Sequence, residues 1–419
     1  MKSIRRQWLA GMGGLLAAPA AFKSAPAQAQ GQPIKVGIGI AQTGPLGGGG
    51  KAALLGLQMW VDDVNARGGL LGRKVQLIAY DDQSNPATTP GIYTKLLDVD
   101  KVDLLVAPYG TNPTAPIMPM VKQRRLLLMG NFSFDVNTTI KHDMWFNNAP
   151  WGGGASAWGG TFLEAGRSLG GKTIAFMAAD AEFAQNLAGG ARTIAKSMGL
   201  QTVYDQNYPP NTVDFSSMIR AVRNARPDIV FIASYPSESA AMVRAINEIG
   251  VGNSVKLIGG GMVGLQFAPV MVPLGSMLNG FVNFHTYVPE KSLDFPGVSD
   301  FLKRYQVRAN QEKVDPLGFY LPPYNYSIGQ VLEQAINATK SLDHNTLAAY
   351  IRSNELKTIV GNYRYDAMGE WATPRLPMVQ FQNIADKDVE QFRQAGKQVV
   401  IAPASLKTGD LIPFDKARK

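Results

Sequence analysis

The sequence contains no cysteine and only three histidines among 419 residues. A chain without thiols forms no disulfide, no thiolate zinc site, no iron–sulfur cluster and no cysteine nucleophile. The histidines are His142, His285 and His344, and none has a His, Asp or Glu three or four residues further on in a helical context. Together with the missing Gly-x-Ser-x-Gly motif, this pattern indicates neither a metal site nor a nucleophile with its base. We therefore expect no metal, no cofactor and no enzyme activity.

Charged side chains are also scarce, at 17% against 45% hydrophobic residues. This balance excludes a disordered chain and a coiled coil, which need more charge and fewer aromatic residues. The 44 glycines and 26 prolines follow no period, which excludes collagen. No segment beyond the N-terminal region reaches 18 apolar residues, so we expect a mature chain that does not span a membrane. At ~100–200 residues per domain, the length allows two or three domains.

The N-terminal residues have the pattern of a secretory signal. Lys2, Arg5 and Arg6 precede a mildly apolar run over residues 8–21, and a small-residue stretch ends in Ala27-Gln28-Ala29. The run is too short and too rich in glycine to be an anchor, which must cross ~30 Å of hydrocarbon. We expect cleavage near Ala29 and a periplasmic location. The paired arginines resemble a twin-arginine signal only loosely, so the export route stays open.

The net charge of +9 raises the question of a nucleic-acid partner. Removing residues 1–29 takes away four cations and no anion, which leaves 37 basic against 32 acidic residues. The remaining Lys and Arg are scattered and form no basic run with interleaved aromatic residues. A solvated surface explains this distribution, so we expect no nucleic-acid partner.

Strands and helices alternate from residue 34 onward. Short apolar segments at residues 34–40, 74–80, 102–106 and 126–129 are predicted strands. Between them, Leu54, Leu57, Val61 and Val64 share one helix face, and residues 86–98 and 114–123 are further predicted helices. This alternation is typical of a parallel, doubly wound sheet.

The alternation starts again after a glycine-rich stretch at residues 151–154. Helices are predicted near residues 156–168, 183–197, 215–222 and 242–249, and strands at 172–178, 201–206, 228–233 and 256–259. Later helices are predicted near residues 297–310, 323–339 and 344–352, followed by a strand at 376–382. We therefore expect two α/β lobes with a seam near residues 147–152.

Two nucleotide-binding motifs are incomplete. Residues 44–51 resemble a phosphate-binding loop, but Pro45 stands at the first glycine position and Ala52 at the final Ser or Thr position. The dinucleotide fingerprint begins at Gly37 and Gly39 but meets Gln42 in place of its third glycine, and it lies inside the predicted strand. Neither motif therefore supports a nucleotide cofactor.

An ordered set of short motifs resembles a known family. The set comprises Gly44-Pro45-Leu46, residues 65–69 with Gly72, residues 81–86, residues 107–114, Pro227-Asp228 and Tyr235. In this order it is similar to the Leu/Ile/Val-binding branch of the periplasmic solute-binding proteins, which feed ABC uptake transporters. The resemblance covers nearly all of residues 34–385, and it rests on the ordered set because each motif alone is weak.

The resemblance implies two doubly wound α/β lobes joined by a three-stranded hinge, the type I or Venus-flytrap arrangement. It implies lobe one over residues 34–148 plus 280–355, lobe two over 149–279 plus 356–385, and a C-terminal extension over 386–419. It also implies a small-molecule ligand held between the lobes, and permease subunits of an ABC transporter as partners. We expect a monomer.

Three polar residues are candidates for the ligand site. Ligands of doubly wound sheets bind beyond the carboxyl ends of strands, and Thr111 follows the strand at 102–106. A helix expected to start near Thr114 would offer its first N–H groups to a carboxylate. The resemblance implies that the Thr111 hydroxyl holds the carboxylate, that Ser133 lies in a second carboxylate-binding loop, and that Tyr235 contributes from the opposite lobe. The register around Ser133 stays open by one or two residues.

Two departures from the family pattern bear on the ligand. Amino-acid binders carry an acidic residue after the next strand to meet the α-ammonium, whereas this chain has residues 259–263, Gly-Gly-Gly-Met-Val, there. An ammonium left unpaired in a closed cleft costs several kcal/mol. Residues 131–134 also carry two aromatic rings where small residues are usual. We predict an apolar, aromatic or branched carboxylic acid without an amine, enclosed by Phe132, Phe134, Trp151 and Met262.

Other functions stay open at this point. The same two lobes would suit a branched-chain amino acid, an amide or urea, and they would also suit the ligand-sensing subunit of a signalling system. Neighbouring permease and ATPase genes would favour transport over sensing. A turnover assay would reveal a secreted enzyme.

Overall fold

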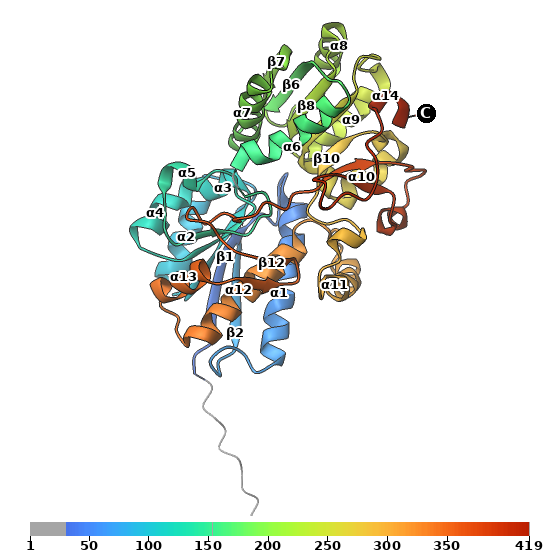
Figure 1. The fold of residues 1–419 in the computed structure, drawn as a ribbon. Coiled ribbons are helices and arrows are strands. Elements are labelled where there is room, and N and C mark those ends of the chain that lie inside the picture. The colour runs from blue at the N-terminus through green and yellow to red at the C-terminus, as the bar shows by residue number, and fades with distance from the viewer. Residues whose placement is uncertain (1–30, 153, 419) are drawn as a thin grey trace, which may run out of the picture.

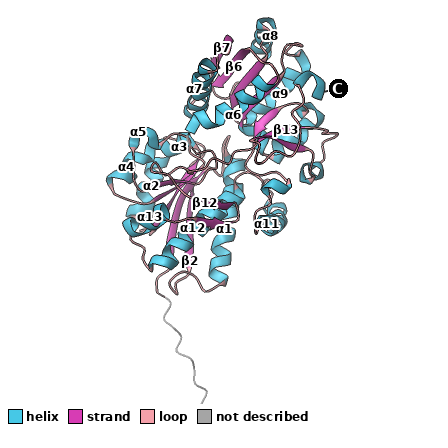
Figure 2. Ribbon diagram, viewed as in Figure 1, coloured by secondary structure: helices cyan, strands magenta, loops and turns pink. Residues whose placement is uncertain are grey.

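The computed structural model describes residues 31–152 and 154–418, so the predicted signal peptide lies outside the described residues. The chain forms two α/β lobes, one above the other in Figure 1. Lobe one contains a five-stranded sheet and lobe two a seven-stranded sheet. In both lobes helices flank the sheet (Figure 2). The doubly wound α/β fold class predicted from the sequence is confirmed.

The sheet of lobe one is parallel throughout and has the order β2-β1-β3-β4-β5. Its strands are β1 (Ile34–Ile40), β2 (Val75–Asp81), β3 (Leu104–Tyr109), β4 (Leu128–Asn131) and β5 (Trp145–Asn147). The connecting helices are α1 (Gly47–Ala66), α2 (Thr89–Asp98), α3 (Thr111–Thr114), α4 (Met118–Gln123) and α5 (Asn137–Ile140). The strand order reverses between β1 and β3, which is where ligands bind in such sheets.

The sheet of lobe two has the order β14-β13-β10-β9-β8-β6-β7. Its parallel strands are β6 (Thr173–Ala179), β7 (Gln201–Tyr208), β8 (Ile229–Ser234), β9 (Leu257–Met262) and β10 (Val282–Phe284). Two antiparallel strands, β13 (Met378–Phe381) and β14 (Gln398–Ala402), extend it at the β10 edge. Its helices are α6 (Gly154–Ser168), α7 (Glu182–Ser197), α8 (Ser216–Ala225), α9 (Pro236–Ile249), α10 (Ala268–Leu274) and α14 (Phe414–Ala417).

The late helices return to lobe one. They are α11 (Val298–Glu312), α12 (Pro322–Thr339) and α13 (His344–Ser353). Helix α12 lies directly against α1, because a Cβ atom at Gly56 would stand 2.3 Å from the Pro322 carbonyl oxygen and one at Gly329 would stand 2.0 Å from the Trp60 ring. Only glycine allows so close an approach of the two helices.

The two sheets divide the chain differently from the expected lobe limits at three places. Strand β10 pairs with β9, so lobe two continues past residue 279 to Phe284. The hairpin of β11 (Leu356–Thr358) and β12 (Gly361–Tyr363) instead lies on α12 of lobe one, where the Gln334 side chain donates to the Lys357 carbonyl over 3.0 Å. Strand β14 pairs with β13, so the segment after residue 385 adds a strand to the larger sheet and is not merely an extension.

Three segments cross between the lobes, and they run side by side. The first follows β5, the second follows β10, and the third connects β12 to β13. The Arg375 N–H donates to the Pro150 carbonyl over 2.6 Å, which joins the third crossing to the first. The His285 N–H donates to the Pro377 carbonyl over 2.9 Å, which joins the second to the third. Such paired crossings permit a hinge motion while they resist free rotation.

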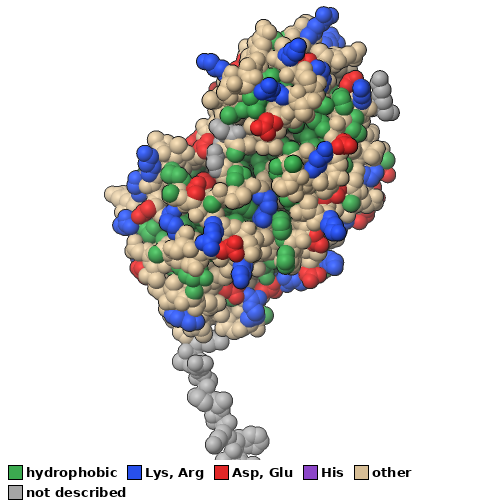
Figure 3. All heavy atoms as spheres, in the orientation of Figure 1, with side chains coloured by type: hydrophobic (Ala, Val, Ile, Leu, Met, Phe, Trp, Pro, Cys, Tyr) green, Lys and Arg blue, Asp and Glu red, His purple; other side chains and the backbone are tan. Residues whose placement is uncertain are grey.

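Buried apolar side chains form one contiguous cluster that runs through both lobes and the crossings. A second, smaller cluster fills the opposite face of the lobe-one sheet, around Trp145 and Tyr93. Among the described residues no helix combines the length and the hydropathy needed to cross a bilayer. Lys and Arg side chains are spread over the face of both lobes that Figure 3 shows, without a single basic patch there.

Candidate functional site

A small cavity lies between the lobes, beyond the carboxyl ends of β3 and β8. Its volume is about 30 Å³, which is room for about two water molecules. We call it the aromatic cavity, because seven of its thirteen lining residues are aromatic. The lining residues are Leu46, Tyr109, Gly110, Thr111, Asn112, Pro113, Phe132, Trp151, Trp158, Phe183, Tyr235, Val263 and Tyr320.

Thr111 holds a central position in this wall. It is the first residue of α3, so the helix begins three residues earlier than predicted, and its side chain is buried at 2% exposure. Its Oγ accepts the N–H of Phe134 over 2.9 Å. No acceptor among the described residues takes the hydrogen of this hydroxyl. Thr111 therefore keeps one donor for a ligand oxygen, while Gly110 before it turns the chain with a φ of +93°.

Asn112 and Tyr235 meet across the cavity from opposite lobes. The Asn112 amide donates to the Tyr235 hydroxyl over 2.9 Å, and its carbonyl oxygen accepts the N–H of Phe183 over 3.2 Å. Phe183 stands in the first turn of α7, so a lobe-one side chain satisfies a free N–H group at the start of a lobe-two helix. The lobes are therefore closed against each other. Tyr235 lies where the sequence predicted, but Asn112 was not predicted.

The rings of the two lobes form a continuous aromatic contact. Phe132 packs edge-on against Trp151 at 5.2 Å and Tyr320 at 4.9 Å between ring centroids. Trp151 in turn lies 5.5 Å from Trp158 of lobe two. Phe132 and Trp151, both named from the sequence, line the aromatic cavity, and so do four rings that the sequence analysis did not name: Tyr109, Trp158, Phe183 and Tyr320.

Three residues predicted for the site, Ser133 and the wall residues Phe134 and Met262, do not line the aromatic cavity. The Ser133 hydroxyl donates to Thr114 over 2.8 Å and is fully buried, so it supports the loop from behind. Phe134 packs 5.6 Å from Trp158 and 5.7 Å from Trp151, which puts it behind these two rings. Met262 ends β9, where its N–H donates to the Asn283 side chain over 2.9 Å. Met262 is fully buried at the end of the strand, whereas Val263, the first residue after it, lines the cavity.

No Asp, Glu, Lys, Arg or His belongs to the described lining of the aromatic cavity. The glycines at 259–261 lie within β9 rather than in a loop, and a Cβ atom at Gly259 would stand 1.9 Å from the Val282 carbonyl oxygen. The loop after β9 therefore starts at Val263 and reads Val-Gly-Leu-Gln, again without a carboxylate. The described lining thus offers no carboxylate to pair with an ammonium group.

The polar groups of the site are neutral hydroxyls and amides. Burial raises the pKa of Tyr109, Tyr235 and Tyr320 above the ordinary value of 10. These phenols therefore keep their hydrogens at neutral pH and can each donate one hydrogen bond. A ligand in this cavity would meet hydroxyl and amide donors in an apolar, ring-lined surrounding.

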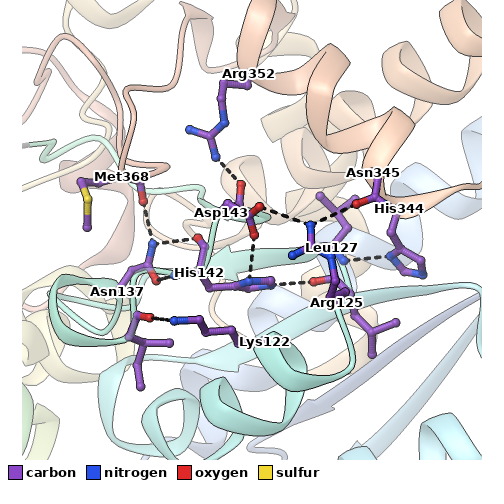
Figure 4. A network of polar contacts seen from close by, with 12 residues as sticks. Lys122, Arg125, Leu127, Asn137, His142, Asp143, His344, Asn345, Arg352 and Met368 are labelled. Carbon is purple, nitrogen blue, oxygen red and sulfur yellow. Dashed lines mark hydrogen bonds and ion pairs between the residues drawn. The ribbon is translucent and has the colours of Figure 1, made fainter.

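Two of the histidines hold backbone groups of lobe one in place (Figure 4). His142 contacts the Leu126 carbonyl through Nε2 over 2.8 Å, and the Leu127 N–H donates to Nδ1 of His344 over 2.8 Å. Asp143 lies beside them and pairs with Arg125 at 3.3 Å. The third, His285, is buried in the second crossing. Across the described residues no three His, Asp or Glu side chains are placed to hold a metal ion.

Residues 33–387 match the family model described as periplasmic binding protein. The chain belongs to the periplasmic binding protein family. The family resemblance predicted from the ordered motifs, to the Leu/Ile/Val-binding branch, is confirmed. Leu/Ile/Val-binding protein homolog 7 of Brucella abortus (strain 2308) is 26% identical over 334 residues, which cover 76% of this chain and 80% of the relative.

Solved structures of periplasmic binding proteins share the fold. The leucine binding protein LivK of Thermotoga maritima superposes with a TM-score of 0.71 at 18% identity, covering 84% of this chain and 96% of that one. An ABC transporter solute binding protein of R. palustris, solved in complex with benzoate, superposes with a TM-score of 0.72 at 16% identity, covering 91% and 99%. At these identities the superpositions show only that this binding protein shares the type I fold.

Proposed function

We propose that this periplasmic binding protein captures a small apolar or aromatic carboxylic acid without an α-amine and delivers it to an ABC importer. The observation that carries the proposal is the lining of the aromatic cavity, which combines rings from both lobes with no charged side chain. A carboxylate would accept the hydroxyl hydrogen of Thr111, which no acceptor among the described residues takes. The benzoate bound by the R. palustris protein has the same chemistry.

A branched-chain amino acid is the second candidate, because the curated relatives are Leu/Ile/Val-binding protein homologues. Its apolar side chain would suit the rings. Its α-ammonium would lie in a cleft whose described walls hold no carboxylate, at a cost of several kcal/mol. The lack of a carboxylate in the described walls therefore favours an acid without an amine.

The aromatic cavity of about 30 Å³ is too small for a ring-sized ligand. Binding therefore requires the lobes to open and to close again around the acid. A ligand drives this change only through the extra contacts it makes in the closed form. The rings of Phe132 and Trp151 on one wall, and of Trp158 and Phe183 on the other, would supply these contacts.

Isothermal titration calorimetry of the mature chain with benzoate and with leucine tests the proposal. We expect benzoate to bind at least tenfold more tightly than leucine. Thermal unfolding gives an independent readout, because a ligand at 100 Kd stabilises the folded state by ~2.7 kcal/mol. Micromolar binding of leucine without binding of benzoate would overturn the assignment of the acid.

The transport role extends the proposal to a permease partner and to a periplasmic location after signal cleavage near Ala29. The alternative is a sensing role with a separate signalling chain. Deletion of the gene should abolish high-affinity uptake of the labelled acid into cells. Unchanged uptake together with a lost transcriptional response to the acid would favour sensing.

A further inference from the structure

A second cavity adjoins the aromatic cavity. It measures about 480 Å³ and is lined by residues 42–49 of lobe one, by Pro236 and Phe267 of lobe two, and by residues 313–315. We call it the outer cavity. Leu46 and Tyr109 line both cavities and so form the partition between them. Because both lobes contribute to its wall, the outer cavity forms through the same closure that forms the aromatic cavity.

The wall of the outer cavity is mainly apolar. Leu46, Tyr109, Phe267, Val270 and Val314 provide hydrocarbon surface from both lobes. The two lysines of the lining, Lys51 and Lys313, are exposed to solvent. The remaining charged side chain, Asp315, is buried. Its Oδ1 accepts the N–H groups of Ala268 and Leu317, and its Oδ2 has no hydrogen-bond partner among the described residues. Apart from this one carboxyl group, the wall offers hydrocarbon surface rather than partners for an ion.

Gly48 lines the outer cavity, and no close packing contact requires a glycine at this position. Three of the four glycines in the first turn of α1 have a structural reason, because a Cβ atom at Gly47, Gly49 or Gly50 would stand 3.0 Å or less from a neighbouring atom. A Cβ atom at Gly48 would meet nothing within 4 Å. Glycine costs a helix ~1 kcal/mol relative to alanine. No packing contact requires glycine at position 48. Its effect there is that this part of the outer-cavity wall carries no side chain.

We infer that the outer cavity is a second subsite, which holds the distal part of an elongated apolar carboxylic acid whose carboxylate lies at Thr111. The inference rests on the proposed function. The aromatic cavity has about 30 Å³ and the outer cavity about 480 Å³, so the greater part of a long ligand has room only in the outer one. The ligand would pass between Leu46 and Tyr109, and Leu46 is only partly buried on a loop.

The affinity for acids of two lengths tests the subsite. We expect 6-phenylhexanoate to bind the full mature chain at least tenfold more tightly than benzoate in calorimetry, because each buried methylene adds ~0.8 kcal/mol, or about fourfold. Gly48→Leu places a side chain in the outer cavity and should weaken 6-phenylhexanoate at least tenfold, with benzoate changed less than twofold. Leu46→Ala widens the partition and should strengthen the longer acid relative to benzoate.

Gly91→Leu is the matched control. Gly91 lies in helix α2, and a Cβ atom there also meets nothing within 4 Å, so this variant should leave both affinities unchanged. Equal affinities of the two acids in the wild type, or an equal loss of both in Gly48→Leu, would overturn the subsite and leave the proposed function standing. If neither acid binds, the proposed function and the subsite fall together. Binding of the longer acid alone supports the subsite.

Discussion

The side chain of Asn112 in lobe one donates a hydrogen bond to the Tyr235 hydroxyl in lobe two over 2.9 Å. This bond joins the lobes without help from a ligand. A net hydrogen bond contributes ~0.5–1.5 kcal/mol, which multiplies the ratio of closed to open molecules by about two to twelve. The pair therefore helps to determine the ratio of closed to open molecules before a ligand binds, and so how far the ligand must shift that ratio.

Tyr235→Phe should shift the unliganded protein toward the open form, because it removes only the hydroxyl that Asn112 reaches. Small-angle scattering should show a larger radius of gyration without ligand and a larger compaction on binding. Tyr204→Phe, on strand β7, is the control and should leave both values unchanged. A radius equal to that of the wild type in both states would show that the hydroxyl does not hold the lobes.

Tyr235→Ala should instead reduce both the affinity and the compaction, because it also removes the ring that packs against Phe183 at 6.0 Å between centroids. Affinity depends on closure when both walls contact the ligand. Calorimetry and scattering on the same sample separate the two effects. Full affinity with no change of radius on binding would argue for a rigid receptor.

Thr111→Ala should weaken the binding of the acid by about 1.5–3 kcal/mol, the range for a hydrogen bond to a charged group. Thr111 is buried rather than placed at an exposed loop tip, so the change also leaves the N–H of Phe134 without its acceptor. We therefore expect a loss of folding stability of about 1–3 kcal/mol as well. Thr111→Ser keeps the hydroxyl and should retain most of both. Unchanged affinity in a folded Ala variant would remove Thr111 from the site.

Glu370 should make folding stability depend on pH. Burial, with Asp366 and Asp135 nearby, raises the pKa of Glu370 from 4.5 to about 8. The folded chain then keeps a proton that the unfolded chain loses between these values. Stability from this group is therefore complete below pH 4.5 and is lost as the pH rises through 8. Asp82 and Asp315, with pKa values raised to about 6, act in the same direction at lower pH.

Glu370→Gln should flatten the fall of the melting temperature between pH 6 and 8, because the amide is neutral at every pH. It can still accept from Asn147, whose Nδ2 donates to the Glu370 carboxyl over 2.9 Å. Differential scanning calorimetry at several pH values measures this slope. Glu164→Gln, at an exposed position of α6, is the control. An unchanged slope in Glu370→Gln would assign the pH dependence to other groups.

Gly49→Ala should lower the affinity without lowering stability. Its Cβ atom would stand 2.9 Å from the Phe267 ring of lobe two, so full closure would require that buried ring to move. Within lobe one the change favours helix α1 by ~1 kcal/mol, which offsets the small shift required of the Tyr109 ring, 3.1 Å from the added Cβ atom. A melting temperature at or above the wild type together with weaker binding is the expected result. Gly160→Ala, in helix α6, meets no neighbour within 4 Å and should change neither.

The sequence predicted helices and strands well where their apolar residues follow a regular period. Apolar strands such as β8 and helix faces such as that of α1 carry their own period, and the ordered motifs identified the family. The lobe limits were harder, because a three-residue strand such as β10 has too few residues for a pattern. Its membership in lobe two depends on pairing with β9 and β13, which are separated from it along the chain.

The site could be predicted only in part. Thr111 and Tyr235 follow strand ends, which is a local signal. Asn112 adjoins Thr111 and could have been found by the same reasoning. Tyr320 follows no strand and reaches the site only because α12 returns to lobe one, so no local pattern marks it. Phe134 and Met262 were misplaced because the face that a side chain takes depends on a register shift of a single residue.

The return of the chain to lobe one has a consequence for the order of folding. Lobe two lacks β13 and β14 until residue 402 has been made, and lobe one lacks α12 until residue 339. Neither lobe is therefore a continuous stretch that could fold while the other is still being synthesised. Contacts between such distant segments also make the folding of the chain slow, because the entropy of closing long loops is lost before those contacts form. Two lobes with separate sheets in the folded protein thus depend on each other to form.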